Sequence, residues 1–319
     1  MGLRVAVTGG AGFIGSHLVE KLVELGNSVV VIDNMSSGSL SNLERVREKI
    51  DLKIADVKDL RTCLDVFKDV EVVYHFAANP EVRVSVTNPK IHFDENVYAT
   101  FVVAEASRLS NNVRTIVFAS SSTVYGDATV PTPEDSSLRP ISVYGASKAA
   151  AELILHSYSH LYGIRVVVLR YANIIGPRLK HGVVYDFLMK LSKNPDVLEV
   201  LGDGRQRKSY LYIDDAIEAT ILAAEASKAP FEVYNVGNSD WVEVSEIAKI
   251  VSKVLGLKPR IVFTGGTKDG RGWPGDVKFM LLSIDKITSL GWRPKHSSAE
   301  AVELAARSLA TELGLLKTF

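Results

Sequence analysis

The stretch VAVTGGAGFIG at residues 5–15 decides the fold of this chain. Residues 5–7 suit a buried parallel strand, and the leucines at positions 18, 22 and 25 repeat with the period of a helix. Gly9, Gly12 and Gly15 therefore lie on a turn between a strand and a helix. Such a turn allows a pyrophosphate to approach the backbone, because unpaired N–H groups and the positive end of the helix dipole meet its charge.

A carboxylate follows this turn at the spacing expected for an adenosine ribose. Residues 28–32 form a second strand, and Asp33 closes it 18 residues after Gly15. Asp33 would accept hydrogen bonds from a free ribose diol and repel a 2′-phosphate, which predicts NAD and not NADP. A helix-capping aspartate without a ligand is the alternative. The polar loop that follows favours an adenosine pocket and contains Asn34, Ser36, Ser37 and Gly38.

Composition excludes several other functions. The chain has 319 residues, 46% of them hydrophobic, and a formal net charge of zero, which gives no support to a nucleic-acid partner. Its single cysteine, Cys63, excludes an internal disulfide framework and a thiolate metal cluster. No apolar stretch reaches membrane-spanning length and no signal core precedes the first strand, so we expect a protein of the reducing cytoplasm without a membrane partner.

The order of the predicted elements indicates an α/β fold, a doubly wound parallel sheet of the Rossmann type with a smaller C-terminal α/β lobe. We expect one domain at residues 1–172, a lobe at residues 173–319, and a return of residues 211–238 to the first sheet. Ligands are expected at the carboxyl ends of the strands. Gly9, Asp33, Asp56, Ala77 and Ser121 fall there. The predicted strands are residues 4–8, 28–33, 51–55, 70–76, 115–120 and 165–170.

A tyrosine and a lysine four residues apart form the candidate chemical centre. Tyr144 and Lys148 begin a predicted helix, and this spacing places them on one face. An ammonium near a phenol favours the phenolate, so Lys148 is expected to lower the pKa of Tyr144 toward that of a general base. None of the other ten of the 11 tyrosines has a lysine four residues later.

Six segments together resemble the extended short-chain dehydrogenase/reductase family, and within it the UDP-glucose 4-epimerases and related nucleotide-sugar epimerases. The resemblance covers nearly the whole chain. It is carried by TGGAGFIG (8–15), DNMSSG (33–38), HFAA (75–78), ASSSTVYG (119–126), YGASK (144–148) and RYANIIGPR (170–178).

The resemblance implies that Ser121 bonds the sugar hydroxyl, Tyr144 removes its proton, and Lys148 also binds the nicotinamide ribose. It implies NAD as cofactor, a UDP-sugar as substrate bound by the C-terminal lobe, and a homodimer built from helices near 96–110 and 145–162. The implied NAD contacts are Gly9, Gly12, Phe13, Ile14, Gly15, Asp33, Asn34, Ser36, Ser37, Gly38, Asp56, Val57, Phe76, Ala77, Ala78, Asn96, Tyr144, Lys148 and Ala172.

The implied reaction is 4-epimerisation of UDP-glucose and UDP-galactose. Hydride moves from sugar C4 to NAD, the 4-ketose turns over, and hydride returns to the opposite face, so NAD is regenerated. Related 4,6-dehydratases carry an Asp-Glu pair where this chain has Ser122 and Thr123, which disfavours dehydration. Other nucleotide-sugar reactions, such as epimerisation or decarboxylation of UDP-glucuronate, and a non-catalytic NAD sensor are the alternatives.

Among the residues expected to bind the substrate, two positions differ from the family pattern. Lys208 stands where related epimerases have arginine, with Arg207 beside it, so either cation is a candidate for the phosphate. Trp273 replaces the arginine of the usual Arg-Pro-Gly-Asp, and Arg271 is expected to substitute as a diphosphate clamp. The full set of predicted substrate contacts is Ser121, Tyr144, Asn173, Arg207, Lys208, Tyr210, Arg271 and Asp276.

Three other features have structural interpretations. His156 and His160 lie four residues apart on a helix without an acidic or third histidine partner, so we predict a surface or subunit contact and no metal site. His75 ends a core strand and is interpreted as a hydrogen-bonded structural histidine. Asp214 and Asp215 precede an apolar helix, where capping and dipole stabilisation account for them.

Overall fold

The computed structural model describes residues 2–316, and the chain divides into two compact units. The first unit comprises residues 1–124, 143–170 and 217–234, and the second comprises residues 125–142, 171–216 and 235–319. Among residues 2–316, no helix has both the length and the apolar character needed to cross a bilayer.

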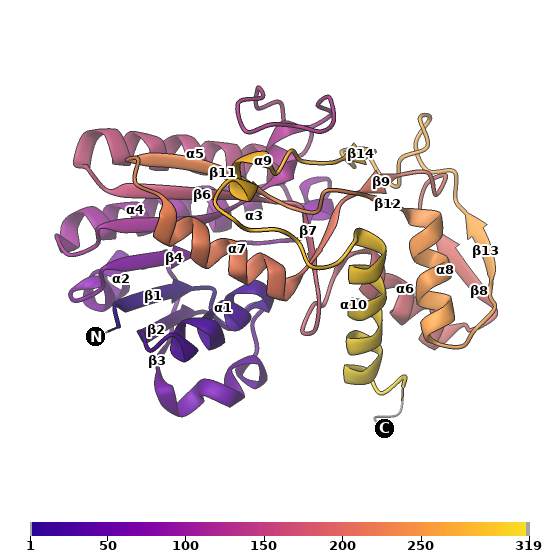
Figure 1. Cartoon of the computed structure of the whole chain (residues 1–319), viewed down its shortest axis with the longest axis horizontal. Helices are drawn as coiled ribbons and strands as arrows, with labels where there is room; N and C mark the ends of the chain where they lie inside the picture. The colour runs from indigo at the N-terminus through magenta and orange to yellow at the C-terminus, as the bar shows by residue number, and fades with distance from the viewer. Residues whose placement is uncertain (1, 317–319) are drawn as a thin grey trace. The chain divides into compact units, whose positions relative to one another are not determined.

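A seven-stranded sheet forms the centre of the first unit, in the order β11-β6-β5-β4-β1-β2-β3 (Figure 1). β1 pairs in parallel with both β2 and β4, β2 with β3, and β4 with β5. This confirms the predicted doubly wound sheet, whose order reverses at β1, where ligands bind in such folds. The strands are β1 (Arg4–Thr8), β2 (Ser28–Asp33), β3 (Ile50–Ile54), β4 (Val72–His75), β5 (Thr115–Ser121), β6 (Arg165–Tyr171) and β11 (Phe231–Val236).

Helices pack on this sheet according to the alternation of its side chains. Ala6, Ile32 and Phe118 belong to a core cluster that also contains Ala99 and Leu155 from the helices α4 and α5. α1 contacts β1 and β2 and buries Leu18, Val19 and Leu22, which lie outside this cluster. The helical segments of this unit are α1 (Phe13–Glu24), η1 (Leu40–Lys49), α2 (Leu60–Phe67), η2 (Val82–Ser85), α3 (Lys90–His92), η3 (Phe93–Tyr98), α4 (Ala99–Ser110), η4 (Ser122–Tyr125), α5 (Val143–Tyr162) and most of α7 (Ile213–Ala226).

The second unit carries three small sheets. β10 pairs in parallel with β7, β13 with β8, and β9 lies between antiparallel β12 and parallel β14. Its elements are β7 (Asn173–Ile175), α6 (Gly182–Lys193), β8 (Val197–Val200), β9 (Arg207–Lys208), β10 (Tyr210–Tyr212), β12 (Val242–Glu243), α8 (Val244–Val254), β13 (Arg260–Phe263), β14 (Phe279–Met280), α9 (Asp285–Thr288) and α10 (Ser298–Glu312).

One predicted helix differs in kind from the observed one. The helix expected at residues 96–110 begins as a π-helical turn, Phe93–Tyr98, and becomes an α-helix only from Ala99. A π-helical turn carries wider hydrogen-bonded rings and often occurs at functional sites. Here it contains Asn96, one of the predicted cofactor contacts.

Candidate active site

Two glycines of the turn after β1 have no room for a side chain. Gly9 has φ +68°, and a Cβ there would lie 2.7 Å from the amide nitrogen of Ala77. A Cβ on Gly15 would lie 2.2 Å from the carbonyl oxygen of Gly9. α1 then begins at Phe13 after Gly12, with no side-chain cap and no acidic residue in its first turn. The first amides of this helix are therefore directed to a site that suits an anion.

Asp33 is fixed against this turn by backbone amides. It is buried at the end of β2, where Oδ2 accepts from the amide of Ala11 at 2.9 Å and Oδ1 from the amide of Met35 at 2.8 Å. A Cβ on Gly38 would lie 2.9 Å from Asp33 Oδ1, so glycine keeps that side of the carboxylate open. Asp33 thus has the position expected for the carboxylate that binds an adenosine ribose.

The other predicted adenosine contacts lie next to Asp33 on the same sheet edge. Asn34 Nδ2 donates to Asp56 Oδ2 at 3.2 Å, and Asp56 Oδ1 accepts from the amide of Lys58 at 2.9 Å. Ser36 and Ser37 are exposed, and Val57 is buried. Exposed polar side chains and a buried valine thus follow the ends of the neighbouring strands β2 and β3, where an adenosine is expected.

Asn96 has both ends of its amide occupied. Its Oδ1 accepts from the amide of Asn79 at 2.8 Å, and its Nδ2 donates to Ser147 Oγ at 2.9 Å. Ser147 Oγ in turn donates to the carbonyl oxygen of Tyr144 at 2.7 Å. Asn96 therefore links the segment after β4 to the start of α5, where the predicted base lies. Phe76, Ala77 and Ala78 precede this segment and are partly exposed.

Ser121, Tyr144 and Lys148 come together where β5 ends and α5 begins. Ser121 is the last residue of β5, and its side chain is hydrogen-bonded to Tyr144. Lys148 is 3% exposed, and its Nζ donates to the carbonyl oxygen of Ala119 at 2.8 Å. The same Nζ lies 6.0 Å from the centre of the Tyr144 ring. Tyr144 as a whole residue is partly buried.

The expected lowering of the Tyr144 pKa by Lys148 is wrong for this structure. Burial raises the pKa of Tyr144 to about 12, and only the hydrogen bond with Ser121 acts in the opposite direction. The ammonium of Lys148 bonds to the Ala119 carbonyl and does not compensate for the lost hydration of a phenolate. Burial also lowers the pKa of Lys148 itself to about 8, while the carboxylate of Glu152 acts to raise it.

Two groups beside this centre were missed by sequence reasoning. Glu152 accepts from Arg170 Nη2 at 2.7 Å and also from Ser120 Oγ, and the side chains of the ion pair are 3% and 6% exposed. His92 is fully buried, neither ring nitrogen has a hydrogen-bond partner, and its ring meets that of Tyr144 edge-on at 5.5 Å. Glu152 lies four residues after Lys148 on the same face of α5. This spacing could have indicated that Glu152 acts on Lys148.

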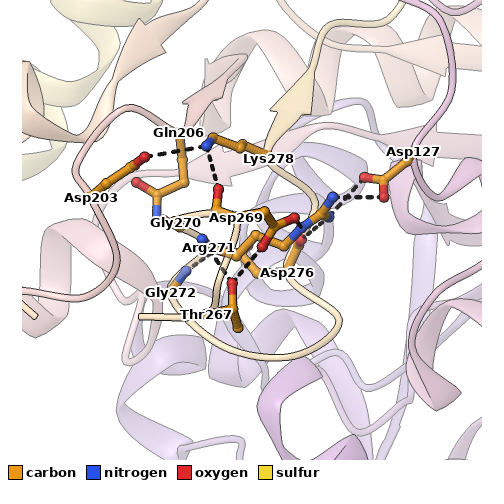
Figure 2. Close-up of polar contacts among 10 residues, drawn as sticks. All are labelled: Asp127, Asp203, Gln206, Thr267, Asp269, Gly270, Arg271, Gly272, Asp276 and Lys278. Carbon is orange, nitrogen blue, oxygen red and sulfur yellow. Dashed lines mark hydrogen bonds and ion pairs between the residues drawn. The ribbon is translucent and has the colours of Figure 1, made fainter. Parts of the chain in front are cut away.

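The predicted substrate residues belong to the second unit, apart from Ser121 and Tyr144. Lys208 Nζ lies 2.5 Å from Asp276 Oδ1, and Asp276 Oδ2 accepts from the amide of Gly272 at 3.2 Å. Arg271 Nη1 donates to the carbonyl oxygen of Asp276 at 2.7 Å. The structure therefore brings Lys208, Arg271 and Asp276 into one cluster (Figure 2 shows the arginine and the aspartate).

Arg207 lies apart from this cluster. Successive residues of a strand point to opposite faces, and Arg207 bonds to Glu243 at 3.3 Å and lies over the ring of Trp241. Asn173 and Tyr210 are register partners in the pair of β7 and β10, and Asn173 Nδ2 donates to the Ser209 carbonyl at 3.0 Å. Ala172 precedes this pair and is buried.

The histidines have the following surroundings. His75 is buried, and its ring nitrogens lie 2.8 Å from Thr8 Oγ1 and 3.0 Å from Thr100 Oγ1, which confirms its interpretation as a hydrogen-bonded structural residue. His156 packs edge-on against Phe231 at 4.7 Å. Within residues 2–316, no cluster of three or more histidine, cysteine or acidic side chains has a geometry that could hold a metal ion.

Comparison with known proteins identifies similar chains along nearly the whole length. The NAD dependent epimerase/dehydratase family model matches residues 5–237. The putative UDP-glucose 4-epimerase of Methanocaldococcus jannaschii is 36% identical over 305 residues, which cover 94% of this chain and 96% of that protein. A crystal structure of a UDP-galactose 4-epimerase is 53% identical with a TM-score of 0.88, covering 98% of this chain and 100% of the other.

A third similar protein was solved with both a substrate and a cofactor. The UDP-glucuronic acid 4-epimerase from Bacillus cereus, in complex with UDP-glucuronic acid and NAD, is 27% identical with a TM-score of 0.89. The match covers 97% of this chain and 100% of that one. The similar proteins thus share a fold and differ in the sugar named for them.

Proposed function

This chain belongs to the NAD-dependent epimerase/dehydratase family, and from that premise we propose that it is a UDP-hexose 4-epimerase that interconverts UDP-glucose and UDP-galactose. The observation that carries the proposal is the grouping of Ser121, Tyr144 and Lys148 at the end of β5 and the start of α5. The similarity to a UDP-galactose 4-epimerase over 98% of the chain favours this substrate pair.

The residues of the first unit fit NAD. The Gly9–Gly15 turn would hold the pyrophosphate, because added Cβ atoms would collide there and because α1 lacks a side-chain cap. Asp33 would bind the adenosine ribose, and Lys148 the nicotinamide ribose. When bound, NAD supplies a hydride acceptor and donor at sugar C4, so the reaction consumes no reductant.

Tyr144 is proposed as the general base toward the sugar C4 hydroxyl. Ser121 is hydrogen-bonded to the phenol, and its Oγ also accepts from the amide of Thr123 at 3.2 Å and from Thr123 Oγ1 at 2.9 Å. A sugar hydroxyl that takes the place of the Thr123 hydroxyl at Ser121 would lie near the base. Since burial raises the pKa of Tyr144 to about 12, the phenolate needs positive charge beside it. A cationic nicotinamide ring would provide that charge, whereas the ammonium of Lys148 is bonded to the carbonyl oxygen of Ala119.

We assign binding of the nucleotide part of the substrate to the cluster of Lys208, Arg271 and Asp276 in the second unit. Lys208 and Arg271 are proposed to bind the diphosphate and Asp276 the nucleoside ribose, supported by their mutual contacts within 2.5 to 2.7 Å. Arg207 is disfavoured for the phosphate because it pairs with Glu243 on the other face of β9. Asn173 and Tyr210 remain proposed contacts to the sugar nucleotide.

We propose a homodimer formed through α4 and α5. The two helices pack against each other (Figure 1). Both expose large apolar side chains. Phe101 is 42% exposed, Leu153 63% and Leu161 67%. A second copy covering these side chains would remove them from water.

Incubation of the purified protein with UDP-galactose tests the proposal. We expect UDP-glucose to appear in the separated UDP-hexoses without accumulation of NADH. Conversion of UDP-glucuronate but not of UDP-galactose would show that the proposed sugar is wrong and that the proposed epimerase reaction is right. A product with a keto group would indicate dehydration, although Ser122 and Thr123 provide no carboxylates for removal of water. NAD binding without any conversion would favour a sensor.

A further inference from the structure

The guanidinium of Arg271 is held by carboxylates from two separate segments. Nη1 and Nη2 each donate to one oxygen of Asp127 at 2.9 Å, so the pair is bidentate. Nε donates to Asp269 Oδ2 at 2.6 Å, and Nη1 also donates to the carbonyl oxygen of Asp276. Figure 2 shows the guanidinium directed at Asp127 from the loop that carries Thr267 and Gly272. The proposed diphosphate clamp is thus already bonded to anionic groups.

The Asp127 pair has the geometry by which arginine binds phosphate. Two parallel N–H groups meet two oxygens of a carboxylate in the same fork that meets two oxygens of a phosphate. A diphosphate that uses this edge of Arg271 must therefore replace Asp127. The arginine side chain is 19% exposed and the Asp127 side chain 46%, so the carboxylate can turn into water while the guanidinium stays in place.

Asp269 is less suited to be displaced. It lies two residues from Arg271 in the same loop, and its second oxygen accepts from Thr267 Oγ1 at 2.6 Å. Thr267 Oγ1 also accepts from the amide of Arg271 at 3.0 Å, so Asp269 belongs to a local turn that orients the arginine. Asp127 comes from a segment 144 residues away, and both of its oxygens are bonded to Arg271.

We propose that Asp127 is an internal competitor of the nucleotide diphosphate, occupying the fork of Arg271 until the ligand displaces it. The inference rests on the proposed UDP-sugar substrate and adds a residue that sets its affinity. Neighbouring cations are also neutralised by carboxylates, Lys208 by Asp276 and Lys278 by Asp203. Asp127 differs from Asp276 because its own side chain is more exposed, 46% against 10%, although the two basic partners are about equally exposed.

Titration calorimetry with UDP and with uridine tests this proposal on the full-length protein. Asp127→Asn keeps the size of the side chain and removes its charge, and we expect it to bind UDP about fivefold more tightly, as the loss of a partly exposed ion pair allows. Uridine, which lacks phosphate, should bind the variant and the wild type equally. The gain for UDP should disappear when Asp127→Asn is combined with Arg271→Ala.

The matched control is Glu303→Gln, which neutralises a carboxylate paired with Arg307 on the surface of α10. This control should leave UDP affinity unchanged. Equal or weaker binding of UDP by Asp127→Asn would overturn the inference, since Asp127 would then hold Arg271 in place for the ligand. An equal gain for uridine would overturn it as well. Wild-type protein that fails to bind UDP would overturn the proposed substrate class together with the inference.

Discussion

Glu152→Gln is the substitution whose effect the structure defines best. Glu152 lies on α5 and accepts from Arg170 Nη2 at 2.7 Å and Nε at 3.1 Å, with Ser120 as a further donor. Its side chain is 3% exposed and that of Arg170 6%. The substitution keeps the shape of the side chain and leaves the arginine charge buried without its counter-charge.

The expected loss of stability follows from that burial. Removal of one partner of a buried ion pair costs about 3–5 kcal/mol, because the remaining charge loses its compensation. With an unfolding entropy of about 2.1 cal/mol/K per residue, the 319-residue chain should lose roughly 4–8 °C in melting temperature. Because Glu152 also raises the pKa of Lys148, loss of activity at alkaline pH should begin at lower pH in the variant.

Melting followed by circular dichroism, with Glu303→Gln as control, measures the first effect. Glu303 pairs with Arg307 at 2.6 Å, but both side chains are exposed, so the control should melt within about 2 °C of the wild type. A Glu152→Gln protein that melts together with the control would refute the reasoning. A pH profile of turnover that does not move would refute the coupling between Glu152 and Lys148.

Four further outcomes are expected. Gly15→Ala should weaken NAD binding at least about tenfold, measured by titration, because its Cβ would lie 2.2 Å from the carbonyl oxygen of Gly9; unchanged affinity would exclude the collision. Tyr144→Phe should bind NAD normally and lower kcat at least about 100-fold in steady-state kinetics, and a wild-type rate would exclude the proposed base. His92→Phe should raise the unfolding free energy by about 1–3 kcal/mol in urea titrations, because two buried ring nitrogens without partners are removed, whereas a loss of stability would show that they are bonded in solution. Burial, followed by the Lys148 charge, lowers the pKa of His75 to about 3, whereas a histidine in the unfolded chain has a pKa of about 6.5. The unfolding free energy should therefore be constant, as far as His75 determines it, above about pH 6.5 and should fall by about 1.4 kcal/mol for each pH unit below it. His75→Asn should flatten this slope between about pH 6.5 and 5, and an unchanged slope would contradict the assignment.

The sheet and the glycine turn could be predicted because local rules dictate them. Alternating strands and helices specify a parallel sheet, and Gly9 and Gly15 occur where the backbone approaches too closely for any side chain. The grouping of Ser121 with Tyr144 followed from a strand end and a helix start. Residues 125–142 group with the second unit, and no periodic pattern in that segment indicated it.

The electrostatics of the site could not be predicted from spacing. Tyr144 and Lys148 are four positions apart and so share one helix face, but the direction of the pKa shift depends on burial, which the sequence does not state. The sequence left Arg207 and Lys208 as alternatives, and our proposal of Lys208 rests on its contact with Asp276, whereas Arg207 pairs with Glu243. The partner of Arg271 lies 144 residues away and has no signal in the sequence.

The fate of a deuterium label at sugar C4 tests the central claim most directly. The wild-type protein is incubated with UDP-galactose deuterated at C4, and the UDP-glucose is analysed by mass spectrometry and NMR. Transient oxidation at C4 with return of the same hydride predicts that the label is retained at C4 of the product and that no NADH is released. Loss of the label to solvent, or no conversion while NAD is bound, would contradict the account.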